Sequence, residues 1–125
     1  MAMKFQREAT SDFAITAYTK TSVTVGGVEF SHSVCISHQA APAPWPVQQF
    51  AEITGETIAH AANVGAEIVL IGTGKSLRFP KPESMRALMN ARIGYEVMDT
   101  AAACRTYNVL LAEGRQVAAL LLIEG

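Results

Sequence analysis

The hydrophobic pattern changes along the chain, from short β-rich stretches at the start to longer amphipathic stretches afterwards. Strands are expected in four β-rich stretches, at residues 14–18, 22–25, 28–30 and 33–37. The pair Gly26-Gly27 between two of them is typical of a two-residue hairpin. Prolines crowd residues 42–46, and because proline lacks a backbone donor we expect no regular structure there.

The rest of the chain alternates apolar runs with stretches of helical spacing. Strands are expected at residues 67–71, 95–98 and 116–123, and helices at residues 55–62, 82–93 and 100–113. Thr54 and Asp99 are suitable N-caps, and Gly94 and Gly114 are suitable helix stops. This order predicts right-handed crossovers between parallel strands. The predicted fold class is therefore α/β: a single three-layer domain over residues 1–125, with a central parallel βαβαβ unit. The N-terminal antiparallel strands extend that sheet or pack beside it, and residues 1–12 form a flexible arm.

The run from Ile68 to Ile71 is continuously apolar and ends in Gly72-Thr73-Gly74-Lys75. Such a run is typical of a strand that is buried on both faces of a parallel sheet. Open α/β sheets usually bind ligands at the carboxyl ends of their strands, and Asp99 ends a second predicted strand. We therefore predict a ligand or partner surface that contains Gly72, Thr73, Gly74, Lys75, Arg78 and Asp99, with Trp45 as a further candidate.

Two nucleotide-binding motifs fail at this turn. The P-loop requires a glycine where this chain has Val69, and the dinucleotide fingerprint requires one where it has Leu77. A smaller anion site survives, in which amides of the turn act together with Lys75 and Arg78. The alternatives are a protein-docking surface, or glycines that only allow a sharp exit from the strand.

Other candidate groups have simpler structural roles. Asp99 is expected to cap its helix, and capping opposes general-base catalysis because amide donors stabilise the charged carboxylate. Cys35 and Cys104 lie in apolar patterns and are expected to be buried thiols, with no histidine assignable as a base for Cys104. Trp45 either covers the core or anchors a partner, and the covering role is favoured.

Composition and charge exclude several classes of binding partner and ligand. The net charge of −1 gives no basic excess for nucleic acid. His32, His38 and His60 show no ligand spacing, so we predict no metal site and no cofactor. The longest apolar run, residues 117–123, is far shorter than the roughly 20 residues of a membrane span. The first residues carry no apolar signal core, so a bacterial cytoplasmic location is expected.

Three segments carry a family resemblance. They are residues 71–74 (Ile-Gly-Thr-Gly), residues 96–110 (Glu-Val-Met-Asp-Thr-Ala-Ala-Ala-Cys-Arg-Thr-Tyr-Asn-Val-Leu) and the segment that begins Glu-Gly-Arg-Gln-Val at residue 113. Through them the chain resembles the small family of uncharacterised bacterial and archaeal domains that includes the mitochondrial complex I assembly factor 3. The likeness covers nearly the whole chain after the first dozen residues.

This resemblance implies a three-layer α/β domain with no established enzymatic activity and no cofactor. It also implies a possible role in the assembly of a protein complex. The mitochondrial relative assembles NADH:ubiquinone oxidoreductase, acting with other assembly proteins at the inner membrane. None of the residues that match the family's motif is an established catalytic residue. They are Gly72, Thr73, Gly74, Asp99, Thr100, Cys104, Asn108, Glu113, Gly114 and Arg115.

Two functional hypotheses remain. The favoured one is a non-catalytic assembly or interaction factor whose partners are respiratory-complex subunits or other assembly factors, peripheral to the inner membrane, with homo-oligomerisation open. The alternative is a binder of small anionic metabolites, or an unrecognised enzyme, that uses the Gly72–Gly74 turn. Both require Thr73 and Asp99 to lie at the same end of the molecule.

Overall fold

The computed structural model describes residues 13–124, so the predicted arm over residues 1–12 lies outside the described residues. The strands are β1 (Ile15–Tyr18), β2 (Val23–Val25), β3 (Val28–Phe30), β4 (Val34–Ser37), β5 (Ala43–Pro44), β6 (Ile68–Gly72), β7 (Gly94–Met98) and β8 (Val117–Leu121). The α-helices are α2 (Gly55–Ile58), α3 (Arg86–Asn90) and α4 (Thr100–Ala112), and short 3₁₀ turns are η1 (Phe50–Glu52), η2 (Ala59–Ala61) and η3 (Pro82–Met85).

The strands form two sheets. The central sheet has the order β5-β4-β8-β6-β7, in which β6 pairs in parallel with both β7 and β8. β4 joins this sheet antiparallel to β8, whereas β1, β2 and β3 form a separate antiparallel sheet. The N-terminal strands therefore divide, since one extends the central sheet and three pack beside it. Gly26 and Gly27 make the predicted hairpin turn with φ angles of 58° and 88°.

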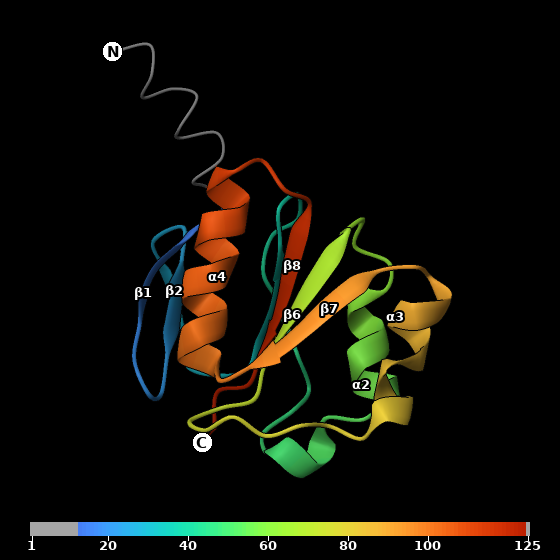
Figure 1. The fold of residues 1–125 in the computed structure, drawn as a ribbon. Helices are drawn as coiled ribbons and strands as arrows, with labels where there is room; N and C mark the ends of the chain where they lie inside the picture. The colour runs from blue at the N-terminus through green and yellow to red at the C-terminus, as the bar shows by residue number, and fades with distance from the viewer. Residues whose placement is uncertain (1–12, 125) are drawn as a thin grey trace.

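Three layers result, as predicted (Figure 1). One face of the central sheet packs against α4 and the β1–β3 sheet, around the fully buried residues Leu70, Ala103 and Tyr107. The other face packs against α2, α3 and the segment with Trp45, around Ile58, Val69 and Leu88. A sheet covered on both faces explains why its inner strands are almost continuously apolar.

Two local predictions were wrong. The proline-rich stretch contains the short edge strand β5, in which Pro44 lies opposite Val34, because an edge strand tolerates a residue without an amide donor. The helix predicted to stop at Gly94 ends earlier. Arg92 takes the left-handed conformation with φ 60°, and Ile93 N donates to Leu88 O at 2.9 Å, so Gly94 opens β7 instead.

β7 is an edge of the central sheet, because among residues 13–124 it pairs only with β6. Its backbone hydrogen bonds to the β6 segment run from Gly94 N to Glu67 O and from Thr73 N to Met98 O. In a parallel ladder the backbone groups of the alternate residues, Tyr95 and Val97, then point away from β6. Exposed Glu96 lies at the centre of this edge, and a charge there hinders pairing with another strand.

Candidate functional site

The carboxyl ends of β6, β7 and β8 meet at one rim of the molecule, at the lower end in Figure 1. Thr73 N donates to Met98 O at 2.9 Å, and Thr100 N donates to Gly74 O at 2.9 Å. The turn after β6 and the start of α4 are therefore directly bonded. Thr73 and Asp99 lie at the same end, as both functional hypotheses require.

Thr100 closes the space between the two strand ends. Its buried Oγ1 accepts from Gly74 N and donates to Leu122 O, each at 2.8 Å. A Cβ added at Gly72 would lie 3.0 Å from Thr100 Cα, so the glycine allows the helix start to approach the strand. The space directly between the end of β6 and the start of α4 is thus filled by the chain itself.

Asp99 is the N-cap residue of α4. Its Oδ1 accepts from Ala102 N at 2.8 Å, and the backbone of Asp99 itself is extended. The carboxylate thereby satisfies one of the amides that a helix start leaves unpaired.

The amides of the glycine turn already have acceptors. Lys75 N donates to Glu124 Oε1 at 3.0 Å, and Arg78 Nη2 donates to Glu124 Oε2 at 3.0 Å. The Lys75 amide and the Arg78 guanidinium together hold the pKa of the Glu124 carboxyl below its ordinary value. Gly74 has a φ of 95°, and a Cβ there would meet the same carboxylate. The turn does hold an anion, but this anion is the chain's own.

Sequence reasoning missed Glu124. The available signal was a lone acidic residue directly after the last apolar strand, but no spacing rule connects it to a turn 49 residues earlier in the chain. Only the parallel pairing of β6 with β8 brings the two segments to the same rim.

Arg78 fastens the loop that follows the turn. Its Nη2 donates to Thr73 O at 2.7 Å, and its guanidinium lies 4.8 Å from the centre of the Phe50 ring. Thr73 Oγ1 donates to Ser76 O at 2.7 Å and accepts from Arg78 N at 3.2 Å. Arg78 Nε is buried and has no hydrogen-bond partner among the described residues. Arg78 is therefore committed to internal contacts.

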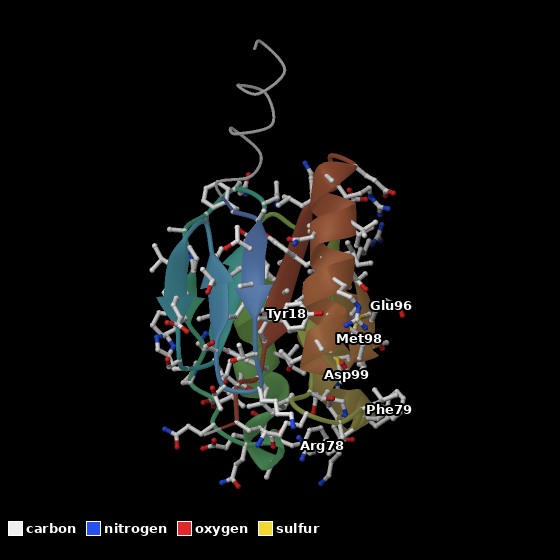
Figure 2. All side chains as sticks on the ribbon, turned by 90° about the vertical axis from the view of Figure 1, so that its left-hand side faces the viewer. Tyr18, Arg78, Phe79, Glu96, Met98 and Asp99 are labelled. Atoms are coloured by element: carbon white, nitrogen blue, oxygen red, sulfur yellow. The ribbon has the colours of Figure 1, made fainter. Side chains whose placement is uncertain are left out.

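The fastened loop presents two large apolar side chains to solvent, which sequence reasoning also missed. Leu77 is 51% exposed and Phe79 is 71% exposed, whereas Pro80 beside them is buried. Figure 2 shows Phe79, Arg78 and Asp99 at the lower end of the molecule, with Met98 and Glu96 following β7 upward from Asp99. We call residues 75–79 the rim loop.

A pocket of about 330 Å³ lies beside the rim loop. It is lined by the segment Tyr18–Lys20, by Gly74–Lys75, by the start of α4 and by Leu122–Glu124. Tyr18, the last residue of β1, extends toward α4 (Figure 2). Its hydroxyl accepts from Arg105 Nη1 at 3.1 Å. The lining is mostly apolar.

The predicted candidates away from the rim are buried. Burial raises the pKa of the Cys35 thiol to about 11 and that of the Cys104 thiol to about 12, so both stay protonated at neutral pH. Tyr107 is fully buried, and its hydroxyl donates to Phe13 O at 2.9 Å. Trp45 is 2% exposed, and its Nε1 donates to Thr57 O at 2.9 Å. Trp45 therefore covers the core on the face of the sheet opposite α4 and is not part of the rim.

Residues 13–124 contain neither a cluster of metal ligands nor a membrane-spanning helix. No group of three histidine, cysteine, aspartate or glutamate residues in this range is placed to hold a metal ion. No helix in the same range is both long and apolar enough to cross a membrane.

The chain matches a family of unknown function and is similar to relatives that are named as assembly factors. A profile described as a protein of unknown function (DUF498/DUF598) matches residues 15–122. The chain is similar to NADH dehydrogenase (ubiquinone) 1 alpha subcomplex assembly factor 3 of Bos taurus, with 31% identity over 119 residues. That match covers 94% of this chain but only 64% of the relative, so the chain spans less than two thirds of the length of that relative.

Solved structures agree with the fold. A crystal structure from Bordetella parapertussis has 41% identity and a TM-score of 0.84, covering 89% of this chain and 95% of that one. A solution structure of a Mth938-like domain from Bordetella pertussis has 34% identity and a TM-score of 0.82, covering 93% of this chain and 89% of that one. The same layers therefore occur in experimental structures of similar sequence.

Proposed function

The chain belongs to the DUF498/DUF598 family of proteins of unknown function, and on that premise we propose that it acts as a non-catalytic assembly or interaction factor. This membership confirms the family resemblance predicted from the sequence. The relative from Bos taurus is named as an assembly factor of NADH dehydrogenase. The proposed partner is accordingly a protein of the respiratory NADH dehydrogenase, either a subunit or another assembly factor, met at the cytoplasmic face of the inner membrane.

The exposed apolar side chains of the rim loop are the observation that carries this proposal. Leu77 and Phe79 project from a loop that Thr73 and Arg78 hold in one conformation. An apolar anchor on a preorganised loop binds a partner without first paying for the ordering of that loop. Large side chains that fill a partner's pocket supply most of the affinity of many interfaces.

The polar groups of the rim support a role without catalysis. Asp99 caps α4, Arg78 pairs with Glu124, and the thiol of Cys104 is protonated and buried. Catalysis by a nucleophile or a base requires a reactive group within reach of a substrate. Asp99, Arg78 and Glu124 are instead used to hold the rim together, and Cys104 is buried in the core.

A genetic complementation experiment tests the proposal. The gene is deleted in the organism that encodes it, and the deletion strain receives the wild type, Leu77→Ser/Phe79→Ser, or the matched control Val28→Ser/Val109→Ser. The control residues are 57% and 56% exposed but lie on β3 and α4, away from the rim loop. The measurements are the amount of assembled NADH dehydrogenase on native gels and the NADH oxidation rate of isolated membranes.

We expect the wild type and the control to restore the complex, and the rim-loop variant to fail although it is equally abundant and folded. Replacing Phe79 with a photo-crosslinking phenylalanine analogue is expected to attach a subunit or assembly factor of the complex. Normal levels of the complex in the deletion strain, or full rescue by the rim-loop variant, would rule the proposal out.

A further inference from the structure

The pocket beside the rim loop has the form of a small-molecule site that the docking proposal does not use. Its volume of about 330 Å³ is at the lower end of the range for ligand pockets. Leu122, Ile123 and Ala101 contribute to an apolar lining, and the ring of Tyr18 adds to it. Such walls suit a compact ligand with an apolar body.

The charged side chains in the pocket lining indicate which charge the polar end of that ligand carries. Of the two carboxylates in the lining, Asp99 accepts from the α4 amide of Ala102, and Glu124 accepts from the Lys75 amide and from Arg78. Both carboxylates are therefore already matched by internal donors.

The lysines in the lining are not matched in this way. Neither Lys20 nor Lys75 has a salt bridge to a carboxylate within residues 13–124. They come from two different turns, Lys20 from the turn between β1 and β2 and Lys75 from the turn after β6. Together with Arg105, which donates to the Tyr18 hydroxyl, these two lysines favour a negative ligand.

We propose that this pocket binds a small organic acid, with its apolar body against Leu122 and Ile123 and its carboxylate between Lys20 and Lys75. This differs from an anion site built on the glycine turn, because the amides of Gly74 and Lys75 are already bonded to Thr100 and Glu124. The proposal is independent of the docking function, since Leu77 and Phe79 do not line the pocket.

Octanoate is a suitable probe, and it is titrated into the isotopically labelled protein while amide chemical shifts are recorded. Saturable shifts are expected at residues 18–20, 74–75 and 122–124, with butanoate binding more weakly because it buries less apolar surface. Octanol and octylamine match the apolar body without the negative charge and are expected to bind at least several-fold more weakly. Added salt is expected to weaken the binding of octanoate.

Three lysine variants isolate the proposed contacts. Lys20→Gln and Lys75→Gln are each expected to weaken octanoate binding about two- to fivefold, as for a solvent-exposed ion pair. Lys81→Gln is the matched control, because Lys81 is exposed and does not line the pocket. Equal effects of all three substitutions, equal binding of octanol, or shifts that neither saturate nor cluster at the pocket would overturn the proposal.

Discussion

The substitution Gly72→Ala tests whether the rim depends on close contact between β6 and α4. The new Cβ would lie 3.0 Å from both Thr100 Cα and Thr100 Oγ1, and 3.3 Å from Ala103 Cβ. Two hydrogen bonds to Gly74 hold Thr100 in place, so the helix start cannot easily move aside. Overpacking of this kind typically costs about 1–3 kcal/mol, against a gain of about 0.4–1 kcal/mol from the reduced freedom of the unfolded chain.

Gly94→Ala is the matched control, because Gly94 lies opposite Ile68 on the neighbouring parallel strand and its added Cβ would meet only Glu67 O, at 3.6 Å. The control should keep the wild-type stability or exceed it by up to about 1 kcal/mol. The two variants should therefore differ by about 2 kcal/mol in the free energy of unfolding. For a chain of this length that corresponds to thermal midpoints about 5–10 °C apart.

Urea denaturation and hydrogen exchange measure these effects. Gly72→Ala should lower the urea midpoint with an unchanged m-value, and it should accelerate exchange of the Gly74 and Thr100 amides, whose bonds join the turn to α4. If Gly72→Ala and Gly94→Ala unfold at the same urea concentration, the close contact between β6 and α4 does not exclude a side chain at position 72, and the reasoning is wrong.

Three further substitutions probe other contacts. Glu124→Gln should destabilise the protein at pH 7, because the folded-state pKa of Glu124 is lowered. In urea titrations the difference in unfolding free energy from the wild type should shrink as the pH falls below the ordinary pKa of 4.5. A difference that stays constant with pH would contradict this. Asn108→Ala removes bonds of 2.8 and 2.6 Å to Ile15 N and O, so it should cost about 1–3 kcal/mol and expose β1 to hydrogen exchange; unchanged protection of β1 would refute it. Glu96→Val should cause self-association through the β7 edge, seen by light scattering, whereas Glu113→Val after α4 should stay at the wild-type mass; equal masses would show that Glu96 does not guard this edge.

The elements that sequence predicts well are set by local signals. The run from Ile68 to Ile71 becomes β6, and the capping residue Asp99 begins α4 at the predicted position. Gly114 ends that helix with a φ of 79°. Hydrophobic period and capping chemistry act over a few residues, so the sequence displays them directly. Parallel pairing then follows from the order of the elements and the handedness of the crossovers.

The contacts that define the rim are not local, and the sequence hides them. Glu124 reaches Lys75 across 49 positions, and Thr100 reaches Gly74 across 26. The sequence pattern predicts that a turn rich in backbone donors lies at the sheet edge, but not whether another part of the chain occupies those donors. The exposure of Phe79 is hidden for the same reason, because an apolar residue directly before a proline could equally well have packed inward.

The internal carboxylate therefore changes where recognition can take place. Because Glu124 and Thr100 satisfy the amides of the turn, the groups left for other molecules lie on either side of it. The proposed docking residue Phe79 is on the rim loop, whereas Lys20 lines the pocket from the turn between β1 and β2. Thr73, Arg78 and Glu124 lie between the two surfaces, and Arg78 donates hydrogen bonds to both of the others. Neither proposed binding event requires these three residues to move. The two proposals can consequently be tested separately. Loss of Lys20 should leave assembly of the complex intact, and loss of the Phe79 ring should leave octanoate binding unchanged.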